Sequence, residues 1–367
     1  MPTLAELAFA ETNLLKCKGY DPKFINKNVS ISATSPLSAS MKKALPTVKG
    51  DTKGILKYTA LSVLFNKRRK VPFYAAYNID GKEKSNKTAR PKFQTDPRFN
   101  AEQQLGYAFY DLRTGGETEF EIGHMASNNE MGRGKEGKLK AFQTFHFTNS
   151  VPQAEKLNSG IWQGLEAYII KEAATINKNK RICVFTGPLM TSKDPRYVED
   201  ESFKIPLLFF KVIIFPTTKG VFSTAFVMSH EKRMIEQKMF AGEPEGLAGE
   251  GMFDDFKYRK VFQVNLSLLE KETGLKFSWP GVKRIKVPNE KNQVKKIRSI
   301  RDAEDAKKAI KTGGMPESLS KKIQPSKKEK AKKDLEKGLV PESLLSNANV
   351  TKKELKRGNY RLNLILP

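Results

Sequence analysis

The 367-residue chain is 38% hydrophobic and 10% aromatic, which excludes disorder throughout and allows one large core or two modest ones. Its formal net charge of +26 indicates a polyanionic partner, nucleic acid first and an anionic membrane surface second. Apolar runs fall short of the roughly 18 residues that span a bilayer, and residues 1–15 lack the basic start of a signal peptide. We therefore expect no membrane segment and a protein that is cytoplasmic or exported by a non-classical route.

Residues 1–54 predict a helix followed by a surface loop. The pattern Thr3 to Glu6 is a capping box that opens an amphipathic helix running to about Lys16. Residues 29–50 are rich in Ser, Pro and Lys, which is typical of a loop on the surface. A folded domain over residues 55–281 comes next.

Apolar runs in that domain predict the strands of one core. The runs with strand character cover residues 58–64, 71–79, 142–148, 181–185, 207–215 and 221–228. Segment 142–148 is included because aromatic and polar residues alternate along it. Helical spacing covers 161–174 and 264–273, and Gly274 stops the second of these helices.

The tail, residues 282–367, contains 24 Lys and Arg against 10 Asp and Glu, a net charge of +14. It also contains a repeat, because KKAIKTGGMPESL (307–319) aligns without gaps on KKDLEKGLVPESL (332–344). Each copy reads as a helix end, a glycine stop and a new helix with proline at its first position. We therefore favour a small basic helical extension over a disordered tail.

The residues with chemical potential are concentrated between Phe120 and Glu166. His124, one of only three histidines, follows an apolar-alternating run, and Asn149, Asn158 and Glu166 come after it. One imidazole beside several oxygen donors suits a hard divalent cation such as Mg²⁺, whereas zinc would want several Cys or His ligands. Asn158 and Glu166 are about two turns apart and can share a helix face if the helix starts near Asn158.

Other residue types in this region have less specific interpretations. We interpret His146 as a strand surface residue and His230 as a loop residue, because neither has comparable neighbours in sequence. Trp162 lies on the apolar side of the predicted helix and is more typical of a core than of a base-stacking site. A basic insertion could bind nucleic acid or be merely solvated, and we favour binding for its residues Arg133, Lys135, Lys138 and Lys140.

These motifs resemble those of the DNA/RNA non-specific endonuclease family, the ββα-metal nucleases of the Serratia nuclease and mitochondrial endonuclease G type. The resemblance runs through Gly123-His124-Met125-Ala126 and Thr144 to Asn149, and then through Gln153, Asn158, Trp162 and Glu166. It covers roughly residues 55 to 280. It implies an α+β fold with a ββα-metal (His-Me finger) core and a central antiparallel sheet.

The resemblance also implies roles for individual residues. His124 takes the place of the general base that deprotonates water, and Asn158 that of the sole direct protein ligand of a hydrated Mg²⁺, for which Mn²⁺ could substitute. Glu166 takes the place of the acid that holds the waters of the metal. Asn149 and Gln153 match positions that support the site.

The chain departs from the family pattern next to the histidine. The family motif is Asp-Arg-Gly-His, whereas this chain has Glu121-Ile122-Gly123-His124, so an arginine beside the phosphate is missing. Its charge could come from Arg133 or Lys135. A second family arginine, which stabilises the pentacovalent phosphorus, would correspond to Arg90. Glu121 is expected to support the site locally rather than to bind metal.

Together these observations predict a Mg²⁺-dependent, sugar-non-specific endonuclease that hydrolyses phosphodiester bonds of DNA and RNA. A catalytically weakened nucleic-acid-binding protein is one alternative. A partner-regulated nuclease effector, of an antiviral defence or toxin system, is another, with an inhibitor or activating protein bound through residues 282–367. A homodimer is left open.

Overall fold

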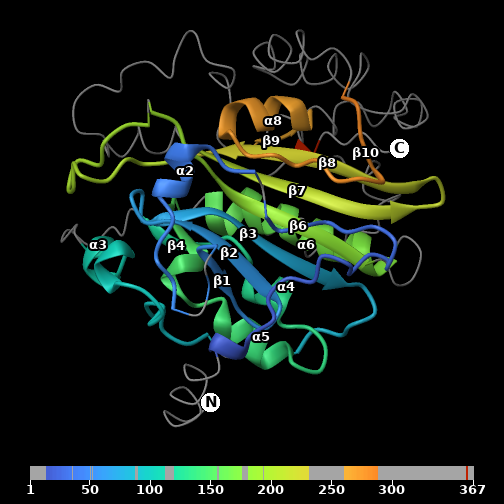
Figure 1. The fold of residues 1–367 in the computed structure, drawn as a ribbon, viewed down its shortest axis with the longest axis horizontal. Coiled ribbons are helices and arrows are strands. Elements are labelled where there is room, and N and C mark those ends of the chain that lie inside the picture. The colour runs from blue at the N-terminus through green and yellow to red at the C-terminus, as the bar shows by residue number, and fades with distance from the viewer. Residues whose placement is uncertain are drawn as a thin grey trace, which may run out of the picture.

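The fold is organised around a large sheet and a separate two-stranded hairpin (Figure 1). The computed structural model describes residues 14–34, 36–49, 51, 53–86, 90–111, 120–154, 157–175, 181–192, 194–230, 260–287 and 361–362. The predicted capping box at Thr3 and the predicted repeat within 307–344 lie outside the described residues. Among the helices in the described ranges, none is long and apolar enough to cross a membrane.

The large sheet has the strand order β1-β2-β3-β6-β7-β8-β9-β11, and β10 pairs with β8. The bounds are β1 Ile55–Lys57, β2 Leu61–Asn66, β3 Val71–Asp80, β6 Arg181–Leu189, β7 Leu208–Thr217, β8 Gly220–Ser229, β9 Lys260–Val264, β10 Val282–Arg284 and β11 Arg361–Leu362. Neighbours from β1 to β9 run antiparallel, whereas β10 runs parallel to β8 and β11 to β9. The α+β class and the central antiparallel sheet are therefore confirmed.

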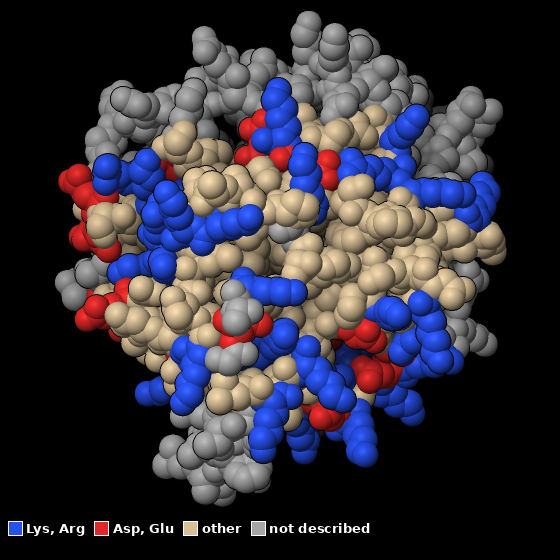
Figure 2. Space-filling model, in the orientation of Figure 1, with Lys and Arg blue, Asp and Glu red and all other residues tan. Residues whose placement is uncertain are grey.

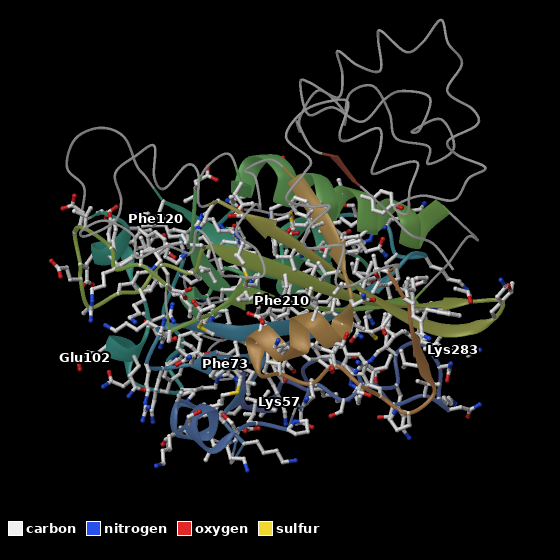
Figure 3. All side chains as sticks on the ribbon, turned by 90° about the horizontal axis from the view of Figure 1, so that it is seen from above. Lys57, Phe73, Glu102, Phe120, Phe210 and Lys283 are labelled. Carbon is white, nitrogen blue, oxygen red and sulfur yellow. The ribbon has the colours of Figure 1, made fainter. Side chains whose placement is uncertain are left out.

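Both faces of this sheet are covered, which explains why its strands read as almost continuous apolar runs. Successive residues point to opposite faces, so Phe209 belongs to one core and Phe210 to the other. Leu165 of α6 (Gln163–Thr175) packs in the core of Phe209, and Leu269 of α8 (Leu266–Thr273) packs in that of Phe210. The two helices thus lie on opposite sides of the sheet (Figure 3).

Helix α8 ends where its sequence predicts. Gly274 caps it with a φ of 70°, a left-handed conformation that favours glycine, and its N–H donates to the Glu270 carbonyl. The remaining short helices are α2 Ala39–Lys43, α3 Tyr107–Tyr110, α4 Asn128–Met131 and α5 Gly137–Gln143, with single 3-10 turns at Leu14–Lys16, Ala101–Gln103 and Phe147–Asn149.

The hairpin consists of β4 (Glu121–His124) and β5 (Ser150–Gln153), paired antiparallel with His124 opposite Ser150. A π-helical segment, Leu157–Trp162, and then α6 follow β5. Strand, strand and helix in this order form the expected ββα unit, hereafter the finger (residues 121–175). It packs on the sheet face that holds Phe209.

The strand predicted over 142–148 is wrong. Helix α5 ends at Gln143, and a 3-10 turn occupies Phe147–Asn149. The alternation that suggested a strand has another cause, because Phe145 and Phe147 both pack against the ring of Phe93 at 5.1 and 5.6 Å between centroids. A tight turn can bring alternate residues to one cluster as effectively as a strand does.

The described residues on either side of 55–281 contact the same fold. Leu14 and Val48 join one core, Tyr20 and Ile31 join the other, and β10 pairs with β8 beyond residue 281. The division of the chain at 54 and 281 stays a prediction.

Candidate active site

His124 ends β4 in an aromatic and largely dry setting. Its ring packs against Phe93 at 4.8 Å and Phe145 at 4.7 Å between centroids, and its buried Nε2 has no hydrogen-bond partner among the described residues. Burial, and to a smaller extent the positive charge of Arg90, lower the pKa of His124 to about 3. The imidazole is therefore neutral at physiological pH and able to accept a proton.

The glycine before this histidine is required by close packing. A Cβ on Gly123 would lie 2.0 Å from Oε1 of Gln153, which comes from the facing strand β5. Both amide atoms of Gln153 are buried with no hydrogen-bond partner in the described part of the chain. Gln153 thus packs directly against β4, and its amide keeps unused hydrogen-bonding capacity beside the residue before His124.

Asn149 fixes the chain segment that leaves β4. Its Nδ2 donates to the carbonyls of Ala126 and Thr144, each at 2.9 Å, and its Oδ1 accepts from the Ala126 N–H at 3.0 Å. Its backbone carbonyl accepts from the Met125 N–H at 2.8 Å. With these bonds a single amide determines the path of the backbone after His124.

Asn158 lies in the π-helical segment and is oriented by Glu121. Its Nδ2 donates to Oε2 of Glu121 at 2.8 Å, so the carbonyl Oδ1 is the end of the amide that can bind a cation. This contact joins the first strand of the finger to its helix. The supporting role of Glu121 in the site stays a prediction.

Glu166 lies about two turns further along the helix and is buried. Burial and the negative charge of Glu130 raise its pKa to about 8, against the opposing effect of Lys211. Lys211 is fully buried on β7, with Nζ 3.7 Å from Oε1 of Glu166 and 3.6 Å from Oε2 of Glu130. The Oε1 atoms of both carboxylates are buried without a hydrogen-bond partner among the residues described.

Sequence reasoning gave no role to Glu130 or Lys211, although both left a signal. Ser127-Asn128-Asn129-Glu130 matches a capping box, and the structure contains that box at the start of α4. Lys211 interrupts a run that is otherwise almost entirely apolar. A lysine at an inward position of a buried strand needs a partner, and here the partners are carboxylates.

The donor set fits a hydrated hard cation. The described residues contain no group of three or more His, Cys, Asp or Glu that could hold a metal ion. An amide oxygen at Asn158 and an oxygen of Glu166 that lacks a donor suit an ion that keeps most of its waters, as Mg²⁺ does.

The basic residues divide into two groups. Arg90 is exposed but close enough for its charge to affect His124. Arg133 donates to the carbonyl of Glu83, and Nζ of Lys140 lies 3.3 Å from a carboxylate oxygen of the same residue, so both point towards the loop after β3. Lys135 and Lys138, at the start of α5, are exposed. Figure 2 shows Lys and Arg gathered along the lower edge of the view, where α5 lies.

The surface position expected for His146 is wrong, His230 lies outside the strands as expected of a loop residue, and the core position of Trp162 is confirmed. His146 is 2% exposed and contacts the Gln143 carbonyl at 3.0 Å. His230 is fully buried after β8. Tertiary packing, which a loop assignment cannot anticipate, buries both. Trp162 is 1% exposed and belongs to the core.

The finger matches the ββα unit that the resemblance implies, and a comparison with known proteins identifies the family. The sequence model of the DNA/RNA non-specific endonuclease family matches residues 40–284. The chain belongs to this family.

Individual relatives are more distant. The uncharacterized protein y4fB of Sinorhizobium fredii (strain NBRC 101917 / NGR234) is 27% identical over 270 residues, which cover 71% of this chain and 39% of that protein. The chain thus spans well under half of the curated relative it matches. A chain in the crystal structure of an EndoG/EndoGI complex is 19% identical with a TM-score of 0.44, over 67% of this chain and 93% of the other.

Proposed function

We propose that the chain is a metal-dependent endonuclease that hydrolyses phosphodiester bonds of DNA and RNA, with Mg²⁺ as cofactor and Mn²⁺ as a substitute. The observation that carries this proposal is a buried, neutral His124 on one strand of a finger whose helix presents Asn158 and Glu166. Membership of the endonuclease family supports it.

His124 is the proposed general base. A neutral ring nitrogen accepts the proton of a water molecule as the water oxygen attacks phosphorus. The low pKa of the imidazole would make it a weak base in isolation. A phosphodiester anion beside the ring raises that pKa, because a nearby negative charge favours the imidazolium. The base thus becomes stronger where substrate is bound.

Asn158 is the proposed metal ligand, and Glu121 orients its amide. When bound, the cation would neutralise negative charge that grows on the phosphate and on the leaving oxygen. Glu166 would accept hydrogen bonds from water in the coordination shell. Asn149 and Gln153 would hold the hairpin in place.

Contacts to phosphate are proposed for Arg90, Lys135 and Lys138. Arg90 is placed to stabilise charge on phosphorus beside His124, and the two lysines extend the basic surface at α5. Phosphate contacts carry no sequence information, so cutting would be non-specific. Ile122 supplies no charge where the family has arginine, and it packs against the core.

The test measures nicking of a supercoiled plasmid and degradation of a structured RNA, with Mg²⁺ or EDTA. His124→Ala and Asn158→Ala are expected to lower cutting by about 100-fold or more, since general base catalysis alone contributes about 10²–10⁴-fold. Circular dichroism and Tm would show that both variants fold.

A wild type that binds both polymers yet cuts neither with Mg²⁺ or Mn²⁺ would reject the proposal. The choice would then lie between a binding protein and a nuclease that needs an activating protein. Truncation after residue 287 keeps β10 in the sheet and would test whether the tail restrains activity.

A further inference from the structure

Three charged side chains from three elements meet under the finger. Lys211 comes from β7, Glu130 from α4 and Glu166 from α6, and their exposed fractions are 0%, 1% and 7%. The ammonium lies 3.6 Å from Glu130 and 3.7 Å from Glu166. We call these three residues the charge cluster.

Lys211 also contacts the neutral parts of the site. Its Nζ donates to the Tyr77 hydroxyl at 3.0 Å and, at 3.4 Å, to the carbonyl of Met125, the residue directly after His124. It lies 4.7 Å from the centroid of the Trp162 ring, in the segment that contains Asn158. One ammonium thus joins the sheet to the backbone behind the base and to the helix behind the metal ligand.

The charge cluster has more negative charge than its donors satisfy. Oε2 of Glu130 accepts from the backbone N–H of Ser127 at 3.3 Å and from its hydroxyl at 3.1 Å. The Oε1 atom of each carboxylate is outside hydrogen-bonding distance of a donor among the described residues, and the ammonium approaches Oε1 of Glu166 only to 3.7 Å. Burial and Glu130 favour the neutral form of Glu166, and a cation beside it would favour loss of that proton; the two carboxylates then face one ammonium, an excess of one negative charge. Buried carboxylate oxygens without donors are costly unless a cation or its waters complete them.

We propose that Lys211 and Glu130 are positioning residues that hold Glu166 ready for the hydrated metal ion and set a single excess negative charge behind it. This proposal rests on the proposed function. The ammonium of Lys211 attracts the carboxylate of Glu166 and holds it in place. Glu130 pairs with the same ammonium, so the positive charge of Lys211 does not fully neutralise Glu166. The finger then binds its cation best when the charges of its two neighbours, one positive and one negative, cancel each other.

A purely structural ion pair makes a different prediction. Replacing a buried pair by neutral residues of similar shape is often neutral or stabilising, and it leaves a separate binding site unchanged. Our proposal, which we call charge control, is that the excess negative charge sets the affinity for the metal ion. It predicts that each single substitution weakens Mg²⁺ binding and that the double substitution restores it.

The chain offers nearly isosteric substitutions for this test. Lys211→Met keeps the length of the aliphatic chain and removes the charge. Glu130→Gln keeps the capping box, which accepts glutamine at the same position. Both are made singly and together in full-length protein that carries His124→Ala. The measured quantity is the Mg²⁺ dependence of Tm, which reports binding without cutting.

Each single substitution is expected to weaken Mg²⁺ binding by about 10-fold or more, the effect usual for residues that orient metal ligands. Lys211→Met leaves two carboxylates that repel each other. Glu130→Gln gives Glu166 an ammonium of its own and neutralises it. The double variant restores one excess negative charge and is expected to bind almost as well as the parent, whereas independent effects would multiply to about 100-fold.

Each outcome decides between charge control and a structural ion pair. Unchanged binding in both single variants, or multiplied losses in the double variant, would overturn charge control while leaving the metal site intact. A parent whose Tm does not respond to Mg²⁺ would instead reject the proposed metal site itself. If Lys211→Met does not fold, Glu130→Gln and the double variant still test charge control. Charge control then requires weaker Mg²⁺ binding in Glu130→Gln and restored binding in the double variant.

Discussion

At the scale of the residue, His230 connects the end of β8 to the active-site finger. Its Nδ1 accepts from the Ala154 N–H at 3.1 Å, and its Nε2 donates to the Pro206 carbonyl at 2.8 Å. Ala154 directly follows β5. Burial lowers the pKa of His230 to about 4, and a proton on Nδ1 would face the Ala154 N–H.

This low pKa predicts a pH dependence of folding stability. An unfolded histidine has a pKa near 6.5, so the unfolded chain binds more protons than the folded one below that value. The contribution of His230 is therefore complete above pH 6.5 and is lost as pH falls towards 4, at up to about 1.4 kcal/mol per pH unit.

Urea unfolding of wild type and His230→Gln at pH 7 and pH 5 would measure this. The difference in unfolding free energy between the two proteins should shrink at pH 5, because only wild type loses the histidine contribution. The raised pKa of Glu166 acts in the opposite direction, because it reduces folding stability as pH rises from 4.5 towards 8. This contribution is the same in both proteins and cancels when their unfolding free energies are subtracted. If the two proteins differ in unfolding free energy by the same amount at pH 7 and pH 5, the low pKa of His230 is contradicted.

At the scale of the element, the β4–β5 hairpin depends on a strand contact that admits no side chain. Gly123→Ala would place a methyl group 2.0 Å from Oε1, 2.4 Å from Cδ and 2.6 Å from Cγ of the buried Gln153, so more than the tip of that side chain would have to move. We expect a loss of stability of about 1–3 kcal/mol, as for other overpacked sites, and a loss of nuclease activity. Denaturant unfolding and plasmid nicking would measure the two effects.

Gly106→Ala is the matched control for this substitution. A Cβ at Gly106 meets nothing within 4 Å and its φ of −125° suits alanine, so the substitution costs only the difference between glycine and alanine as an N-cap, about 0.5–1 kcal/mol. Its stability and activity should stay close to those of wild type. A Gly123→Ala protein as stable and active as the Gly106→Ala control would mean that the hairpin tolerates a larger residue at 123.

The elements that sequence could predict are those whose pattern has a local cause. Gly274 stops α8 through its left-handed conformation, and the long apolar strands match their runs. The burial of His146 and His230 depends on residues far away in sequence, and so does the pairing of Lys211 with Glu130. The candidate site was assembled from motif spacing, which placed Asn158 and Glu166 on one helix, whereas the roles of its residues stay predictions.

At the scale of the whole molecule, charge is concentrated outside the finger. Residues 288–367 contain 21 Lys and Arg against 10 Asp and Glu. Truncation after residue 287 is expected to weaken DNA binding at low salt and to reduce the slope of affinity against salt concentration, because fewer counterions are released. Filter binding of the His124→Ala protein at several salt concentrations would measure this. An unchanged slope would show that the tail makes no contact with the polymer.

The position of Lys211 in the chain has a consequence for biosynthesis. All residues of the finger are made before β7, and the ammonium follows Glu166 by 45 residues. A nascent chain that ends within this interval has two carboxylates under the finger and no cation between them, a combination that resists burial. We therefore expect the finger to close only after the ribosome has released β7, and, if the proposed function is correct, an incomplete translation product would not cut the nucleic acid around it.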